Sequence, residues 1–297
     1  MRTVHHRSRF ALAATFLLAL PCTAFAPWGM EGVGVVSTRD TELRASVSPD
    51  GSTIVWASPD RAGGPGGGDL WQARRVDGRW QDPMPLALDT AAREADPAFS
   101  ADGRWLYFAS DRAGGVGGDD LYRAPVDTDG RIGAAVHLGA AVNSRGDDRA
   151  PVPNRDGVRL MFASDGRGGA RGLDLFVARW NGHAFGDAHA LPGLATDADE
   201  CDGAWIGEDA IVFARSDDVA SAPVRLFVAT CRAGRGPDVA PLALAFNTAD
   251  GITRAPMVDW NRPVEMLVSG AAPSPKAGRL DVYRVLVPTV KGDARCD

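Results

Sequence analysis

Four acidic residues recur at intervals of about 50 residues, each just ahead of an apolar segment, and they are well placed to do chemistry. These residues, called here the lead-in acids, are Glu42, Glu94, Asp148 and Glu200. Two further acids, Asp96 and Asp202, stand two residues after a lead-in acid. Gathered carboxylates can bind a cation or a sugar, and two of them about 5 to 10 Å apart can hydrolyse a glycosidic bond. Either chemistry requires a fold that brings them together.

Charged residues of a second set recur inside glycine-rich segments. Residues 60–67 read DRAGGPGG, residues 111–118 read DRAGGVGG, and a looser copy, DGRGGARG, occupies residues 165–172. The charged members are Asp60, Arg61, Asp111, Arg112, Asp165 and Arg167. Each segment follows a short apolar stretch that ends in Ala-Ser and precedes a second one that begins with Asp-Leu. Self-similarity at a fixed period of this length indicates a repeat architecture.

Each repeat unit has the pattern of four short antiparallel strands. An Asp-Gly turn joins the first two strands, the glycine-rich segment joins the second and third, and a further Asp-Gly or Asn-Gly turn joins the last two. Four such strands in roughly 50 residues form the blade of a β-propeller. Units begin near residues 44, 96, 150, 202 and 255, which predicts an all-β, single-domain propeller over residues 27–287 with five blades, six being the alternative.

The two ends of the repeat region complement each other. The fifth unit reaches its third strand at residues 280–287, after which only a tail of residues 288–297 follows. Residues 30–39, which precede the first unit, have the pattern of an unpaired strand. We expect them to pair with residues 280–287 as the outermost strand of the last blade, because this closes the ring and removes an open sheet edge.

Antiparallel order places the charged residues at one end of the blades. The first strand of each unit begins where the second ends, so the lead-in acids and the glycine-rich loops share one face, called here the rim. This predicts a ring of carboxylates with interleaved arginines around the central channel. The ring is either a polar funnel that binds a cationic segment, a sugar or a cation, or a structural device in which Arg61 and Arg112 pair with acids of neighbouring blades. Repetition favours the structural interpretation, because function usually breaks symmetry.

The N-terminus has the pattern of a secretory signal peptide over residues 1–24. A basic segment with Arg2, Arg7 and Arg9 precedes an apolar run at residues 10–20, which is too short to span a bilayer as a helix. Cleavage is expected after Ala24 or after Ala26. Lipid anchoring at Cys22 is disfavoured by the residues around it. We therefore expect a periplasmic or secreted protein that does not span the membrane.

Charge and cysteine usage restrict the partners and cofactors. Removing the three N-terminal arginines from the 32 basic residues leaves 29 against 38 acidic ones, a net charge near −9 that disfavours nucleic acid. An exported chain can form a disulfide, and Cys231 with Cys296 is the preferred pair. No cysteine or histidine has metal-ligand spacing, and no nucleophile, zinc-protease or phosphate-loop motif occurs. We expect no metal, no cofactor and no catalytic residue.

The units resemble the WD-like propeller repeats of TolB-type proteins. The resemblance is carried by SPDG at Ser48, SADG at Ser100, SDR at Ser110 and DLYR at Asp120. The form SDRAGGVGGDDLYR is also similar to repeats that accompany peptidoglycan-binding outer-membrane domains. The resemblance implies an exported binding scaffold, usually without catalysis. From the repeats, the signal peptide and the lack of a catalytic motif, we expect a non-enzymatic monomer that binds an envelope protein or a cell-wall component through the rim. The alternative is a carbohydrate-binding or glycosidase-like five-bladed propeller that uses Glu94, Asp148 and Glu200 at the channel mouth.

Overall fold

The computed structural model describes residues 28–168 and 171–297. The predicted signal peptide, its two cleavage positions and Cys22 lie outside the described residues. Within the described part of the chain, no helix is long and apolar enough to cross a membrane.

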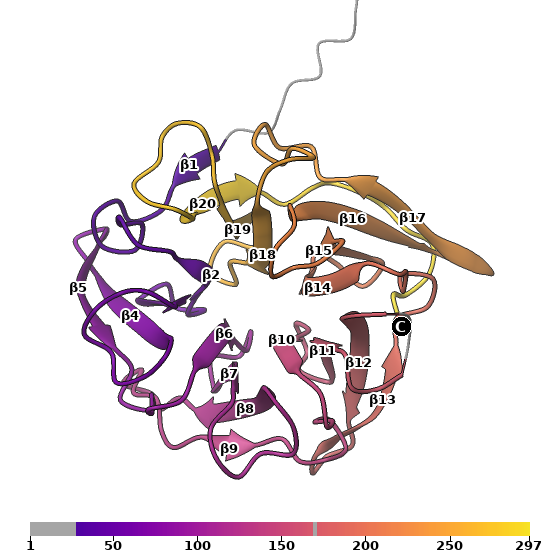
Figure 1. Ribbon diagram of the computed structural model, residues 1–297, viewed down its shortest axis with the longest axis horizontal. Helices are drawn as coiled ribbons and strands as arrows, with labels where there is room; N and C mark the ends of the chain where they lie inside the picture. The colour runs from indigo at the N-terminus through magenta and orange to yellow at the C-terminus, as the bar shows by residue number, and fades with distance from the viewer. Residues whose placement is uncertain (1–27, 169–170) are drawn as a thin grey trace, which may run out of the picture.

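The protein is a β-propeller of five four-stranded antiparallel sheets arranged around a central axis (Figure 1). Blade 1 contains β2 (Leu43–Val47), β3 (Thr53–Ser58), β4 (Asp69–Val76) and β5 (Arg79–Pro85). Blade 2 contains β6 (Glu94–Phe99), β7 (Trp105–Ser110), β8 (Asp120–Pro125) and β9 (Val136–His137). Blade 3 contains β10 (Asp148–Pro153), β11 (Arg159–Ser164), β12 (Asp174–Trp180) and β13 (Phe185–Ala190). Blade 4 contains β14 (Asp199–Trp205), β15 (Ala210–Ser216), β16 (Arg225–Arg232) and β17 (Arg235–Pro241). Blade 5 contains β18 (Thr253–Val258), β19 (Glu265–Gly270), β20 (Asp281–Leu286) and β1 (Trp28–Met30). The predicted fold class and the count of five blades are confirmed.

The core lies between the blades, where the second and third strands carry aromatic side chains. The second strands β3 and β11 are buried along their whole length because both of their faces pack against neighbouring blades. In each of the first four blades, two aromatic residues lie opposite each other on the second and third strands. Phe108 and Tyr122 stack with ring centroids 5.6 Å apart, and Phe162 and Phe176 do so at 6.0 Å. Such pairs add stabilisation beyond the apolar area that they bury.

The N-terminal segment closes the ring, as predicted, but with different residues. Strand β1 pairs with β20, so that Trp28 faces Val285 and Met30 faces Tyr283. Of the predicted residues 30–39, only Met30 belongs to the strand; Val33 and Ser37 form an isolated bridge with each other, and most of the others lie in turns or bends. The strand bounds were therefore wrong. Gly32 and Gly34 adopt positive φ angles of 55° and 80°, which end the extended conformation directly after β1.

The C-terminal residues 288–297 fasten the ring a second time. They run back from blade 5 and reach blade 4, where Cys296 forms the predicted disulfide with Cys231. The backbone N–H of Cys296 donates to the carbonyl oxygen of Glu208 at 3.1 Å. Asp297 then forms ion pairs with Arg159 and Arg179 of blade 3. The segment predicted as a tail is thus bound to two blades.

Candidate binding site at the channel mouth

The lead-in acids are buried and hold the turn that precedes each first strand. The side chain of Glu94 is fully buried. Its carboxylate accepts the hydroxyl of Thr90 at 2.7 Å and the backbone N–H of the same residue at 2.9 Å. The same arrangement recurs between Thr38 and Glu42, Ser144 and Asp148, and Thr196 and Glu200. The carboxylates therefore lie beneath the rim and serve as local capping groups.

An arginine follows the second strand and contacts the lead-in acid of the same blade. Arg112 lies 2.9 Å from Glu94, with its guanidinium over the rings of Phe108 and Tyr122. It also donates to the carbonyl oxygen of Leu88, in the connection from blade 1. Arg167 lies 3.7 Å from Asp148. The expected pairing of Arg61 and Arg112 with acids of neighbouring blades was wrong. Arg112 pairs with the acid of its own blade, and its bond to the Leu88 carbonyl makes the link to the blade before it. Arg61 donates to the carbonyl oxygen of Val35 at 3.0 Å.

Arg215 plays this part in blade 4, and the sequence pattern missed it. It lies 2.7 Å from Glu200 and donates to the carbonyl oxygen of Leu194. In the first three blades the arginine comes after the serine that ends the second strand, whereas Arg215 comes just before Ser216. An arginine beside that serine was the available signal.

The glycine-rich loops pack against the next blade. At its start, each loop is bonded to the segment that enters its own blade: Asp111 accepts the backbone N–H of Arg93 at 2.7 Å, and Asp60 and Asp165 accept those of Thr41 and Asp147. The later part of the loop reaches the next blade. A Cβ at Gly117 would lie 2.4 Å from the carbonyl oxygen of Gly146, at the start of blade 3. Glycine is required there because the two backbones approach each other closely. The repeated motif thus explains how the blades join.

Burial strongly raises the pKa of one lead-in acid, Glu42. Burial, together with the nearby Asp281, raises the pKa of Glu42 to about 7, although Thr38 and Arg61 oppose the shift. The pKa of Glu42 is higher in the folded than in the unfolded protein, so proton binding to Glu42 stabilises the fold. This contribution is complete below the unfolded pKa and is lost as the pH rises through about 7. Between pH 4.5 and 7.5, we expect the unfolding free energy to fall by about 1 to 2 kcal/mol more in the parent protein than in Glu42→Gln. Urea unfolding of both proteins at several pH values measures this difference, and parallel pH profiles would contradict it.

The first strand of every blade contains a left-handed residue that faces the channel region. These residues, which have φ angles of 47° to 55°, are Arg44, Asp96, Ala150, Asp202 and Ala255. Each lies at a β-bulge, where the register between the first and second strands shifts. Non-glycine residues rarely adopt this conformation, and it tends to occur at functional sites. The left-handed backbone conformation recurs in all five blades, but the side chain at this position differs between blades, so the fivefold symmetry is broken at this position.

Arg44 extends from blade 1 across the channel to blades 3 and 4. It is fully buried, and its Nη2 donates to the carbonyl oxygens of Ala150 at 3.3 Å and Gly203 at 3.2 Å. Its Nη1 lies 3.6 Å from Asp202, which also binds Arg254 at 2.8 Å. Burial acts to raise the pKa of Asp202, but Arg254 and Arg44 hold it below the usual range. At the depth of the first-strand bulges, the side chain of Arg44 obstructs the channel.

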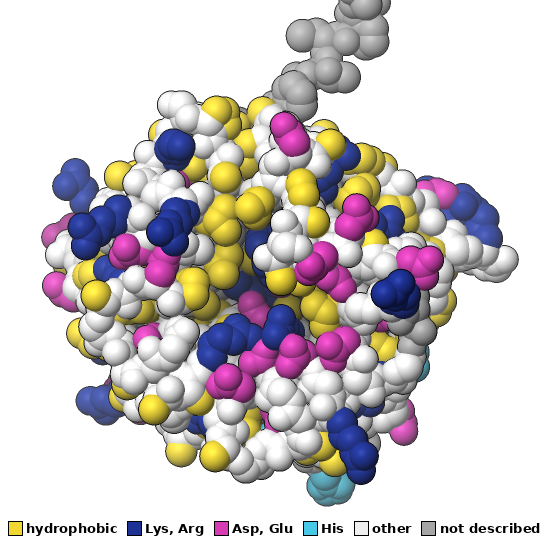
Figure 2. Space-filling view, viewed as in Figure 1, with side chains coloured by type: hydrophobic (Ala, Val, Ile, Leu, Met, Phe, Trp, Pro, Cys, Tyr) yellow, Lys and Arg dark blue, Asp and Glu magenta, His cyan; other side chains and the backbone are white. Residues whose placement is uncertain are grey.

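A second asymmetric group of charges lies at the rim, between blades 2 and 3. This group, called here the mouth cluster, consists of Arg93, Asp119, Asp147 and Arg149. Asp119 is buried and accepts bonds from both arginines, and Arg149 also binds Asp147 at 2.6 Å. Figure 2 shows a central hollow, with acidic and basic side chains gathered on the side of β6 and β10 and hydrophobic ones on the opposite side.

The sequence pattern had not singled out this cluster. Positions that match Arg149 hold Leu43, Ala95 and Cys201 in blades 1, 2 and 4, and a second arginine, Arg254, in blade 5. Positions that match Arg93 in blades 1, 3 and 4 hold Thr41, Asp147 and Asp199, so the pair of arginines around one acid does not recur. Departure from the repeat was therefore the signal that could have found it. Within residues 28–168 and 171–297, no group of three His, Cys, Asp or Glu residues could hold a metal ion.

Comparison with known proteins identifies the fold. Neither a protein-family model nor a curated protein sequence matches this chain. The catalytic domain of a GH62 α-L-arabinofuranosidase from Coprinopsis cinerea is 10% identical, with a TM-score of 0.52 over 88% of this chain and 97% of that one. A family 117 glycoside hydrolase from Zobellia galactanivorans is 12% identical, with a TM-score of 0.51 over 88% and 90%.

TolB proteins are also among the similar structures. TolB from Acinetobacter baumannii is 15% identical, with a TM-score of 0.47 over 85% of this chain and 56% of that one. This chain thus matches little more than half of that protein's length. Likeness at such identities shows the fold and does not decide between a binding scaffold and an enzyme. The chain is a five-bladed β-propeller, a fold consistent with the TolB-type resemblance of its repeats.

Proposed function

We propose that this protein is an exported, non-enzymatic propeller that binds an envelope protein or a cell-wall component at the channel mouth. The observation that supports this proposal is the mouth cluster. It places charges of both signs at one side of the hollow, whereas the lead-in acids recur in four of the five blades. A surface that departs from the repeat is where specific recognition is expected.

The mouth cluster is organised before a partner arrives. Asp119 is only 4% exposed and anchors Arg93 and Arg149, whereas these arginines and Asp147 are each about one-third exposed. Partly exposed charges that are already fixed in place lose little side-chain entropy on binding and favour a partner with a complementary pattern. Because Arg44 obstructs the channel below, the partner binds at the mouth and does not thread through the ring.

The rim residues named from the sequence support this surface from beneath. The lead-in acids and their arginines fix the turns that carry Arg93 and Asp147. Asp111 and Asp165 bind the backbone of these same two residues at 2.7 Å. Their part in binding is therefore to position the mouth cluster.

Neutralising two of the three partly exposed members of the cluster should weaken partner capture. The test is affinity capture from envelope extract by the parent protein and by the double variant Arg93→Gln/Asp147→Asn, with mass spectrometry to quantify what is bound. We expect capture of the partner to fall about tenfold, because two interfacial charges are lost. Arg131→Gln is the matched control, since this arginine is 74% exposed and bonds only Asp127 and Asp129 of its own turn. Equal capture by the double variant and the parent would remove the channel mouth from the proposal.

The alternative function is glycoside hydrolysis by channel carboxylates. It needs two carboxyl groups that reach the substrate. Glu94, Asp148 and Glu200 have fully buried side chains that are already bonded to Thr or Ser and paired with arginine. This burial favours the binding function. A screen for polysaccharide hydrolysis, with Glu94→Gln and Glu200→Gln as controls, tests this alternative. Hydrolysis by the parent protein but not by these variants would overturn a purely binding role.

A further inference from the structure

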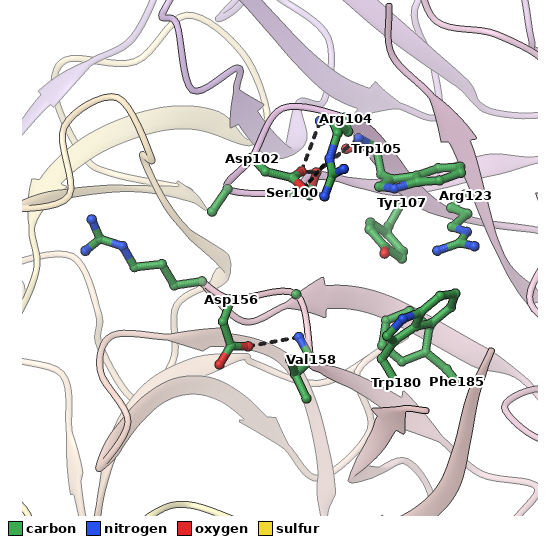
Figure 3. A pocket seen from close by; sticks show the side chains of 13 residues that line it. Ser100, Asp102, Arg104, Trp105, Tyr107, Arg123, Asp156, Val158, Trp180 and Phe185 are labelled. Carbon is green, nitrogen blue, oxygen red and sulfur yellow. Dashed lines mark hydrogen bonds and ion pairs between the residues drawn. The ribbon is translucent and has the colours of Figure 1, made fainter. Parts of the chain in front are cut away.

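A second cavity lies on the face opposite the rim, between blades 2 and 3. It has a volume of about 300 Å³, and the Asp-Gly turns of the two blades border it. Figure 3 shows aromatic side chains on one side, including Trp105 and Trp180, and Asp102 and Asp156 across the space from them. The cavity is independent of the mouth cluster, because the turns at Asp102 and Asp156 lie at the other ends of the strands from the glycine-rich loops.

Arg123 lies against the aromatic wall with its charge uncompensated. Its guanidinium carbon is 4.0 Å from the ring centroid of Trp105 and 4.8 Å from that of Trp180. It contacts the Tyr107 side chain. Among the described residues no carboxylate forms an ion pair with Arg123, and its buried Nε has no hydrogen-bond partner. A half-buried cation that lines a cavity and has no carboxylate partner is a suitable site for an anion.

The arginine at the matching position of blade 5 has carboxylate partners within the protein. Arg284 occupies the same position in the third strand, after the sequence DVY where Arg123 follows DLY. Three carboxylates surround it: Glu31 and Asp259 at 2.6 Å and Glu265 at 2.9 Å. The position therefore receives full internal compensation in blade 5 and none in blade 2. The missing carboxylate of blade 2 must come from a ligand if Arg123 is to be neutralised.

We propose that this cavity binds a sugar that carries a carboxylate. The carboxylate pairs with Arg123, and the apolar face of the sugar ring lies against the half-exposed indoles of Trp105 and Trp180. Ser100, Asp102 and Asp156 across the cavity supply polar groups for the hydroxyls. An aromatic wall with a few convergent polar groups is typical of small-molecule sites, and the volume suits one or two sugar units.

The test is calorimetric titration of the mature protein with matched acidic and neutral sugars. D-glucuronate against D-glucose represents acidic polysaccharides, and N-acetylmuramic acid against N-acetylglucosamine represents the cell wall. We expect at least one acidic sugar to bind tenfold or more tightly than its neutral match, since a charge-assisted bond to Arg123 is lost in the neutral one. Acetate should compete poorly, because it lacks the ring that contacts the indoles.

Variants of Arg123 decide whether this residue is responsible. Arg123→Gln should weaken binding of the acidic sugar about tenfold or more, and Gln72 stands at the matching position of blade 1, so the change is compatible with the fold. Arg123→Lys keeps the charge and should keep part of the affinity. Arg131→Gln, on the remote hairpin of the same blade, should bind like the parent. Equal binding of acidic and neutral sugars, no binding of either, acetate as strong as the sugar, or parental affinity in Arg123→Gln would each overturn the proposal.

Discussion

We expect a chain that begins at Gly32 to have a free energy of unfolding about 5 kcal/mol lower than that of a chain that begins at Trp28. The three residues of β1 complete the fifth blade by pairing with β20. Their removal leaves β20 as an open edge, so that blades 1 and 5 are joined only by the remaining contacts, such as the bond from the backbone N–H of Glu42 to the carbonyl oxygen of Leu280. Because ring closure couples all five blades, the loss exceeds that of an ordinary terminal trim.

Packing around Trp28 accounts for most of this effect. Its ring centroid lies 5.1 Å from that of Phe246 and 5.3 Å from that of Tyr283, both in edge-to-face geometry. Loss of a packed tryptophan alone costs about 3 to 5 kcal/mol. Glu31 adds a bond to Arg284 at 2.6 Å and accepts the indole N–H of Trp80. Both contacts join the segment to blades 5 and 1.

Thermal unfolding followed by circular dichroism measures the difference. For a protein of this size, we expect the melting temperature to fall by about 10 °C or more. Glu31→Gln serves as the control, because it keeps β1 and removes only the charge, so its melting temperature should fall by much less. Melting of the two chains within about two degrees of each other would mean that β1 does not close the ring.

Loss of the disulfide should be the second large effect. Cys231 and Cys296 are 65 residues apart in sequence, and a crosslink over such a loop contributes about 4 kcal/mol by restricting the unfolded chain. The double variant Cys231→Ser/Cys296→Ser also frees the C-terminal segment from Glu208 and from blade 3. We therefore expect its unfolding free energy to fall by about 4 kcal/mol.

Chemical denaturation with and without a reducing agent measures this contribution. Reduction should lower the stability of the parent protein and leave the double variant unchanged. Cys201→Ala is the matched control, because Cys201 is buried and free, so this variant should remain as sensitive to the reducing agent as the parent. If the denaturation midpoint of the parent protein is the same with and without the reducing agent, the prediction is contradicted.

Much of the architecture is encoded locally, and the sequence alone therefore predicts it. Asp-Gly turns and runs of alternating apolar residues specify each hairpin within a few residues of chain, and their recurrence specifies five blades. Pairing of Cys231 with Cys296 was also predicted correctly. The bounds of the closing strand were not, since a short strand beside glycines has little local signal until β20 is in place.

Tertiary structure alone decided which charges are buried and which are free to bind. The lead-in acids look like exposed site residues in sequence, but each is enclosed by a turn and an arginine brought by the neighbouring strand. Arg44 meets Asp202 only because the ring brings blade 1 opposite blade 4. Arg123 and Arg284 occupy the same place in their repeats, yet only Arg284 has carboxylates around it. A repeat specifies the local strand and turn, whereas the charge around a side chain depends on neighbours that the closed ring places beside it.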